Sequence, residues 1–344
     1  MNSKKNGILL VSKKYSTSTF FKVFVAITIL LFSVMFALSF GAVEVPVDQV
    51  ISCLFQDCDS SINTMIVQEL RLPRVLLALF AGAGLALSGT MLQNATNNAL
   101  ADPYLFGIVS GAGLGAIVYN LLGIELGSVG MTFFAFAGAL ISVLLVMSVV
   151  INKAFKRPEI IVLTGVAVSF MMAALSQFLL YVSEPLAANR IIFWLMGSVS
   201  FASFNSVYLV ATVVTLSSVI LWLMRGSIDA LLLGDEQAKS IGVNVDAIRI
   251  ILLLFSAAIT AVIVAFCGGI GFVGLMIPHI VRWFGFTRMS TLIPAVLIAG
   301  GLLLLWVDVI ARTSIENQEI PLGVITSACG SLFFLLILKK KTRV

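Results

Sequence analysis

Charged side chains are scarce in this sequence: 11% of the 344 residues are Asp, Glu, Lys or Arg, whereas 60% are hydrophobic. A soluble domain carries about 25% charged residues, so this composition excludes an ordinary soluble fold. Many apolar runs exceed the ~18–20 residues that a helix needs to cross a bilayer. Alternating segments of ~10 residues, the pattern of a membrane β-barrel, are not visible. The sequence therefore predicts an all-α integral membrane protein.

Groups that carry catalysis or bind metals are equally scarce. The one histidine, His279, has no thiol or carboxylate cluster beside it, so we expect a structural role and no metal site. Neither H-E-x-x-H nor a convincing catalytic triad occurs, and a P-loop is missing. GAGLGA at 111–116 fits a dinucleotide pattern, but no βαβ unit surrounds it. We expect no enzyme activity, metal or cofactor in this chain, which must draw its energy from a partner.

Cysteine is also rare, with four residues in the chain. Cys267 and Cys329 lie in apolar segments and are expected to pack. Cys53 and Cys58 share a polar loop, where they form a disulfide if the loop faces an oxidising compartment and stay as free thiols if it does not.

Ten apolar segments are separated by polar and turn-forming residues. The first is too long for a signal-peptide core, so we expect it to be retained as a span. The chain then divides into a tail (1–22), a ten-helix membrane domain (23–338) and a basic tail (339–344). The expected spans are 23–41, 74–93, 103–122, 131–151, 160–182, 206–224, 249–267, 272–286, 291–311 and 321–338.

The distribution of basic residues predicts the orientation. If the gaps alternate between the two sides, 17 of the 21 Lys and Arg residues fall on the side of the N-terminus. The positive-inside rule then places both termini in the cytoplasm. Arg71, Arg74, Arg190 and Arg312 remain outside. This bias also accounts for the net charge of +5 without any nucleic-acid partner.

Three segments depart from a plain apolar helix. AGAGLALSG (81–89) carries small residues on more than one face, so its helix is expected to be central in the bundle. The segments 183–204 and 268–280 look like broken helices, which line a pathway or are simply packed by protein.

The longest cytoplasmic connection, 226–248, contains the polar stretch LLLGDEQAKSIGVNV (231–245).

Five motifs occur together in one order. They are QELRLPRVLLALFAGAGLALSGTMLQ (68–93), NNALADPYLFGIVSGAGLGA (97–116), LLLGDEQAKSIGV (231–243), GGIGFVGLMIPHIVRWFG (268–285) and DVIARTSIENQEIPLGVITSACGSLFF (308–334). From about residue 23 onward the chain resembles the permease subunits of ABC importers for iron-siderophores, haem and vitamin B12, the FecCD-type or type II importers.

The resemblance implies ten transmembrane helices per subunit and a dimer of this chain with itself or with a related permease. It also implies two cytoplasmic ATPase subunits, which bind ATP and Mg, and a periplasmic or lipid-anchored substrate-binding protein. The metal-chelate substrate would pass between the two permeases. The implied location is a bacterial cytoplasmic (inner) membrane.

The resemblance further assigns roles to residues of this chain. In the coupling loop, two short helices joined by Gly-Val-Asn would dock on the ATPase, with Ala238 and Ile241 facing it; a solvated loop is the alternative. The arginines at the outer ends of spans would grip the binding protein; alternatively they snorkel, with Arg312 paired to Asp308 at i,i+4. Residues of spans five and ten would line the path, or simply pack. The coupling set is Gly234, Asp235, Glu236, Ala238, Ile241 and Gly242; the docking set is Arg71, Arg74 and Arg312; the path set is Met171, Met172, Ser176, Gln177, Thr326 and Ser327.

Two other function classes compete with an importer permease. An ion-coupled secondary transporter usually has ionisable residues near the bilayer centre, whereas here they fall at or near span ends, with Asp308 the deepest. A membrane-embedded enzyme would need a catalytic cluster. Within the importer family, a ferric siderophore is the expected cargo, and haem or vitamin B12 are the alternatives.

Overall fold

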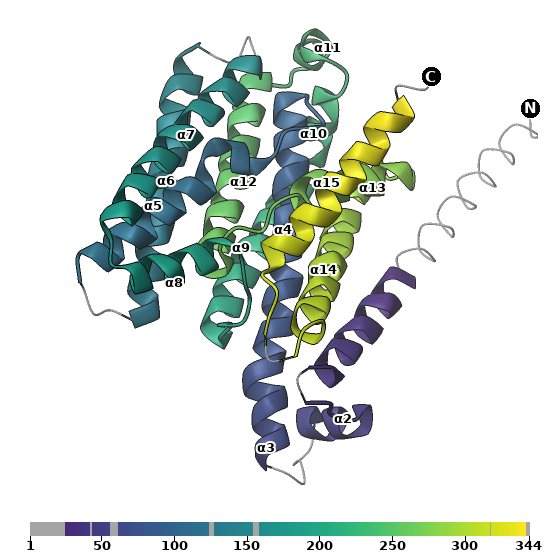
Figure 1. The fold of residues 1–344 in the computed structure, drawn as a ribbon. Coiled ribbons are helices and arrows are strands. Elements are labelled where there is room, and N and C mark those ends of the chain that lie inside the picture. Colours follow the sequence, from purple (N-terminus) through teal and green to yellow (C-terminus); the bar gives the residue numbers. More distant parts are fainter. Residues whose placement is uncertain are drawn as a thin grey trace, which may run out of the picture.

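The computed structural model describes residues 25–41, 43–55, 61–123, 127–153, 158–316 and 318–341. Within these ranges the fold is helical, and an isolated bridge between Ile315 and Gln318 is its only β-type pairing. The helices are Val25–Ser39 (unlabelled in Figure 1), α2 (Val47–Phe55), α3 (Ser61–Thr64), the π-helix η1 (Met65–Arg71), α4 (Leu72–Thr96), the 3-10 helix η2 (Pro103–Phe106), α5 (Ile108–Leu121), α6 (Gly127–Lys153), α7 (Pro158–Val182), α8 (Pro185–Leu195), α9 (Phe204–Leu223), α10 (Arg225–Leu231), α11 (Asp235–Ser240), α12 (Val245–Cys267), α13 (Val273–Trp283), α14 (Met289–Thr313) and α15 (Leu322–Lys341).

A helix lies at each of the ten expected spans. Six continuous helical stretches are long and apolar enough to cross a membrane, so the chain is a multi-pass membrane protein. They are Ile62–Thr96, Val129–Val150, Ile160–Val182, Phe204–Leu223, Val245–Cys267 and Met289–Thr313. The other four expected spans hold shorter helices, Val25–Ser39, Ile108–Leu121, α13 and Leu322–Ile337. That these four also cross stays a prediction.

Helix α4 is the centre of the bundle, as its small residues predicted. In its most apolar stretch, 83% of the residues are buried inside the chain, and it packs against α9, α12, α13 and α14. A methyl group added at Gly82 would collide with the carbonyl oxygen of Gly300 on α14, and one added at Gly89 would collide with Gly274 on α13. Because lipid tails are as apolar as the helices, such close backbone packing is what holds membrane helices together.

Hydrogen bonds supplement this packing on another face of α4, the one that contacts α12. The Ser88 hydroxyl lies 2.8 Å from the carbonyl oxygen of Ser256 and 2.6 Å from the hydroxyl of Thr260, both on α12. All three residues are completely buried. The bonds fix α12 against α4 without leaving a polar group unpaired in the apolar interior.

Interrupted helices meet inside the bundle. The turn after α8 and the turn after α12 share two bonds, Ser198 N–H to Cys267 O (2.8 Å) and Gly269 N–H to Leu195 O (3.2 Å). The start of α15 joins them through two more, Leu322 N–H to Gly197 O (2.9 Å) and Gly323 N–H to Met196 O (3.0 Å). The broken segments expected at 183–204 and 268–280 thus meet at their turns, where backbone groups of one segment satisfy those of the other.

A single side chain closes this junction. The Tyr104 hydroxyl, carried by η2, donates to Ile270 O and accepts from Ile270 N–H, both at 2.8 Å. It therefore satisfies both backbone groups of a residue in the turn between α12 and α13, where no helical partner is available.

The ends of the bundle are structurally distinct (Figure 1). One end carries α10, α11 and the C-terminal end of α15, whereas α2 and α3 lie at the opposite end.

Cys53 of α2 is buried and disulfide-bonded; its expected partner, Cys58, lies outside the described residues. Cys267 is buried as expected, but Cys329 is exposed on α15.

Candidate functional site

The residues expected to act fall into three groups, at the two ends of the bundle and along α7 and α15. The first group is the arginine cluster, defined here as Arg71, Arg74 and Arg312 with the carboxylates Asp308 and Glu319. It lies where η1 leads into α4 and α14 ends, at the α2–α3 end of the bundle (Figure 1).

Arg71 is turned into the protein. Its side chain is buried, and Nη1 donates to the carbonyl oxygens of Leu38 (2.7 Å) and Ser39 (2.9 Å), while Nη2 donates to Val43 O. Leu38 and Ser39 end the helix Val25–Ser39 and Val43 follows it, so Arg71 fastens the end of that helix to η1. We had expected this guanidinium to face an outside partner; instead its donors are used within the chain.

Arg312 has the same inward arrangement. It is buried, donates from Nη2 to Ala37 O at 2.7 Å, and has its Nε 3.4 Å from Asp308 Oδ2. The pairing with Asp308 at i,i+4 is therefore confirmed. Asp308 is 1% exposed and lies near the end of α14. Its buried carboxylate is stabilised by ion pairs with two arginines, Arg74 and Arg312.

Arg74 differs because one of its partners is accessible. Its Nε donates to Asp308 Oδ1 at 2.9 Å, while Nη1 and Nη2 donate to Glu319 Oε1 and Oε2 at 2.6 and 3.1 Å. The Arg74 side chain is 12% exposed and that of Glu319 is 44% exposed. The guanidinium of Arg74 is thus held between the buried carboxylate of Asp308 and the half-exposed carboxylate of Glu319.

Glu319 is held in its charged form. Its partial burial alone would raise the carboxyl pKa, but hydrogen bonds from Arg74 and from the Ser200 hydroxyl outweigh burial and leave the pKa below its usual value. Nothing in the sequence indicated this pair, since Glu319 lies 245 positions from Arg74.

The second group lies on the α10–α11 segment (defined here as residues 225–242) at the other end of the bundle. Gly234, with φ +98°, joins the two short helices, and Gly242, with φ +85°, follows the second. Asp235 and Glu236 begin α11, as expected. Gly-Val-Asn (242–244) joins α11 to the next helix, as expected, but the expectation of a second short helix was wrong, because that helix is the long α12. It is capped by Asn244, whose side chain accepts a bond from Ala247 N–H at 3.1 Å.

Each half of the segment is fastened to a different long helix. Arg249 of α12 donates to both carboxylate oxygens of Asp235, at 2.9 and 3.0 Å, which fixes α11. Asp229 of α10 accepts from Met289 N–H, the first residue of α14, at 2.9 Å. A displacement of α11 is therefore transmitted to α12, and a displacement of α10 to α14.

The apolar surface of this segment differs from the one expected. Ala238 is completely buried and faces the chain's own interior, so it presents nothing to a partner. Ile241 is 62% exposed, and Leu232 and Leu233, which sequence reasoning missed, are 53% and 60% exposed. The run of leucines at 231–233 could have indicated an exposed apolar surface, because a short helix can bury only some of three consecutive leucines. In the structure Leu231 is the buried one.

The third group, the expected path residues, is not brought together within one chain. Met172, Ser176 and Thr326 are buried, and Ser176 donates to Ser110 O at 3.3 Å. Met171 and Gln177 are exposed on α7, and Ser327 is half-buried on α15. These two helices lie apart in Figure 1. Within the part of the chain that the structure describes, the expected path residues of α7 and those of α15 do not enclose a conduit.

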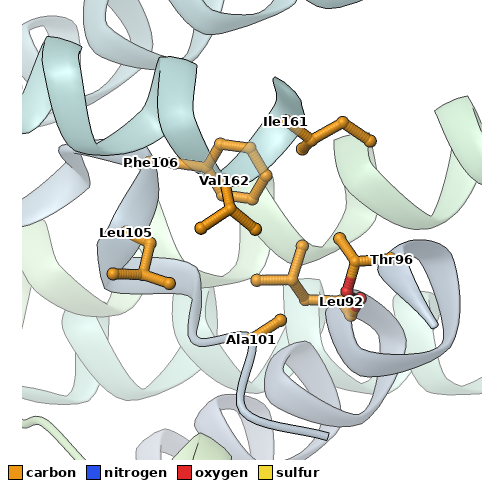
Figure 2. Close-up of a pocket in the computed structure, with 7 residues that line it drawn as sticks. All are labelled: Leu92, Thr96, Ala101, Leu105, Phe106, Ile161 and Val162. Carbon is orange, nitrogen blue, oxygen red and sulfur yellow. Dashed lines mark hydrogen bonds between the residues drawn. The ribbon is translucent and has the colours of Figure 1, made fainter. Parts of the chain in front are cut away.

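A small pocket between α4, η2 and α7 is not a ligand site (Figure 2). Its lining is apolar except for Thr96, whose hydroxyl is already bonded to Leu92 O at 2.8 Å.

Among the described residues, no group of three or more His, Cys, Asp or Glu side chains is placed to hold a metal. His279 packs edge-on against Trp283, with ring centres 5.0 Å apart.

Comparison with known proteins gives a consistent result. Residues 29–340 match the model of the FecCD transport family. The chain is 32% identical over 329 residues to the Fe(3+)-citrate import system permease protein YfmD of Bacillus subtilis, covering 96% of this chain and 97% of that protein. It is 34% identical over 279 residues to the vitamin B12 import system permease protein BtuC of Serratia proteamaculans, covering 80% and 82%. Among solved structures, a transporter assigned to the metal-chelate type of ABC transporter, in an inward-facing conformation, superposes with a TM-score of 0.82 at 28% identity, covering 92% of this chain and 98% of that one.

Proposed function

Because this chain belongs to the FecCD transport family, we propose that it forms the transmembrane path of an ABC importer for ferric siderophores. It is a permease subunit with the type II importer permease fold and is not itself an enzyme. A permease of this kind works with ATPase subunits and a substrate-binding protein. The further points, on pairing, docking, orientation and cargo, are our proposal.

The ATPase docks on the α10–α11 segment. The observation that carries this proposal is the exposed apolar set Leu232, Leu233 and Ile241 on a polar segment whose two halves are fastened to α14 and α12. Apolar side chains rimmed by charges suit a protein partner. Gly234 and Gly242 set the turns, and Asp235 and Glu236 contribute the acids at the start of α11.

The binding protein docks at the opposite end, on the arginine cluster. Arg74 is the residue best placed to meet a partner's carboxylate, since Arg71 and Arg312 are turned inward and act by holding the surrounding backbone. The α10–α11 end is then cytoplasmic, together with the basic C-terminal end of α15. This agrees with the positive-inside bias and with insertion in a bacterial inner membrane.

Two copies, or this chain and a related permease, enclose the substrate path. The exposed positions on α7 support this arrangement: Met171 and Gln177 point out of the single bundle, where a second subunit would complete a conduit. The names of the relatives mention ferric citrate and vitamin B12. We favour a ferric siderophore; haem and vitamin B12 are the alternatives.

Reconstitution tests the proposal. The chain is placed in liposomes with its partner ATPase and binding protein, and uptake of a radioactive ferric siderophore is measured against haem and cobalamin as competitors. We expect uptake that needs ATP and both partners and persists when a protonophore removes the proton gradient. Transport by this chain alone, or uptake that stops with the proton gradient, would show a secondary transporter instead.

A further inference from the structure

Of the three arginines in the cluster, only Arg74 holds a partner that can be exchanged. Arg71 donates to backbone carbonyls, whereas Arg312 donates to one carbonyl and forms an ion pair with the buried Asp308. Replacing those partners would require moving the backbone or uncovering a buried charge, which is costly. Glu319, by contrast, is a half-exposed side chain on the segment between α14 and α15.

The geometry around Arg74 leaves no free donor pair. Nε faces Asp308, and both Nη atoms face the two oxygens of Glu319. A carboxylate arriving from outside prefers the same two-pronged geometry. It can reach both Nη atoms only by taking the position of Glu319.

We propose that Glu319 is an internal substitute for the docking partner's carboxylate, and that the binding protein displaces it from Arg74 when it docks. This inference rests on the proposed function, because it assumes that a carboxylate of the binding protein meets Arg74. In the free transporter, Glu319 keeps Arg74 neutralised and closed to other anions. Docking exchanges one carboxylate for another, so the charge on Arg74 is never left unpaired.

Displacement of Glu319 affects the junction of broken helices. Glu319 also accepts the hydroxyl bond of Ser200, in the turn between α8 and α9. Three residues further on, Leu322 and Gly323 donate to the carbonyls of Gly197 and Met196 in the same turn. Releasing Glu319 therefore removes one side-chain bond between the α8–α9 turn and the segment that leads into α15, while the backbone bonds between them remain. Docking is thereby signalled to the junction of broken helices.

The internal pair lowers the apparent affinity for the partner, because only the open fraction can bind. A half-exposed two-pronged pair contributes about 1 kcal/mol, which corresponds to about a fivefold change in Kd. Glu319→Gln keeps the shape of the side chain and removes its charge, so it should tighten docking by about fivefold. Glu316→Gln, at an exposed position on the same segment, is the matched control and should leave Kd unchanged.

The experiment uses the full transporter, permease with ATPase subunits, in lipid nanodiscs. Docking of the partner binding protein is measured by biolayer interferometry for wild type, Glu319→Gln, Glu316→Gln, Arg74→Gln and the Arg74→Gln/Glu319→Gln double variant. If Glu319 acts through Arg74, its substitution tightens docking only when Arg74 is present. Arg74→Gln is preferred to Arg74→Glu, because a new carboxylate would face the buried Asp308.

A second measurement does not involve the binding protein. Phenylglyoxal reacts with the Nη atoms of accessible arginines, and mass spectrometry of the peptide carrying Arg74 reports its rate. We expect modification to be several-fold faster in Glu319→Gln than in wild type and unchanged in Glu316→Gln.

The outcomes separate the two proposals. If Arg74→Gln weakens docking but Glu319→Gln neither tightens it nor speeds the modification of Arg74, the substitute role is wrong and the docking proposal stands. If Glu319→Gln weakens docking, Glu319 contacts the partner itself and the substitute role is again wrong. If Arg74→Gln leaves docking unchanged, docking at Arg74 and the role of Glu319 both fail.

Discussion

Arg249 grips Asp235 with both terminal nitrogens, at 2.9 and 3.0 Å, and so joins the short helix α11 to the long helix α12. The Arg249 side chain is 7% exposed, whereas that of Asp235 is 44% exposed. Because the buried partner belongs to α12, the pair fixes the direction in which α11 leaves the bundle.

Removing this pair should separate ATP hydrolysis from transport. Arg249→Met keeps about the same buried volume and removes the charged partner of the half-exposed Asp235. Loss of about 1.5 kcal/mol in hydrogen bonding corresponds to roughly a tenfold lower population of correctly placed α11. We expect uptake per ATP hydrolysed to fall by up to about that factor in proteoliposomes. Lys239→Met, exposed on the same helix, is the control, and equal coupling in both variants would contradict the role of the pair.

The contact between α4 and α14 should not tolerate a methyl group. In Gly82→Ala the new Cβ meets the carbonyl oxygen of Gly300, and the two helices must separate. Overpacking of this kind costs about 1–3 kcal/mol. We expect a clear fall in the unfolding temperature measured by intrinsic fluorescence in detergent. Gly226→Ala on α10, where an added Cβ has no neighbour within 4 Å, should be neutral or slightly stabilising; equal effects at both sites would show that the close approach is unimportant.

The hydroxyl of Tyr104 should matter more than its ring. Tyr104→Phe leaves the N–H and C=O of Ile270 without their partner in the turn between α12 and α13. Unsatisfied buried groups cost about 1–3 kcal/mol. Hydrogen exchange followed by mass spectrometry should show faster exchange at 268–272. Tyr119→Phe, a hydroxyl at an exposed site, is the control and should leave exchange in that turn unchanged.

The two carboxylates that share Arg74 should differ strongly in their effect on stability. Asp308→Asn leaves Arg74 and Arg312 charged around a neutral side chain, and breaking a buried pair costs about 3–5 kcal/mol. Glu319→Gln removes an exposed partner and should cost at most about 1 kcal/mol. Thermal unfolding of the two variants side by side checks this. A Glu319→Gln variant as unstable as Asp308→Asn would mean that Glu319 holds the fold together.

The pair between Arg74 and Glu319 should persist in mildly acidic medium. Since the pKa of Glu319 is below its usual value of 4.5, its contribution to stability is present above that value and is lost only as pH falls through the lower, folded-state pKa. The difference in docking between wild type and Glu319→Gln should therefore be the same at pH 7 and at pH 5.5. A difference that disappears by pH 5.5 would contradict this.

Local features of the chain were predictable. Apolar length gave the helix positions, small residues placed α4 at the centre, and the four-residue spacing gave the Asp308–Arg312 pair. Contacts between distant segments were not predictable. Arg71 is buried because the carbonyls of Leu38, Ser39 and Val43 surround its guanidinium. Ala238 faces inward because α11 packs on α12. No spacing rule connects Arg74 with Glu319.

The shared bonds between broken helices also bear on how the protein is made. While the ribosome has yet to supply Leu322 and Gly323, the carbonyls of Met196 and Gly197 lack the donors that they have in the finished fold. Polar groups left unpaired in an apolar environment are unfavourable, so we expect the other helices to reach their final packing only after α15 has been added. A nascent chain stalled before residue 322 should consequently be a preferred substrate for membrane quality-control proteases.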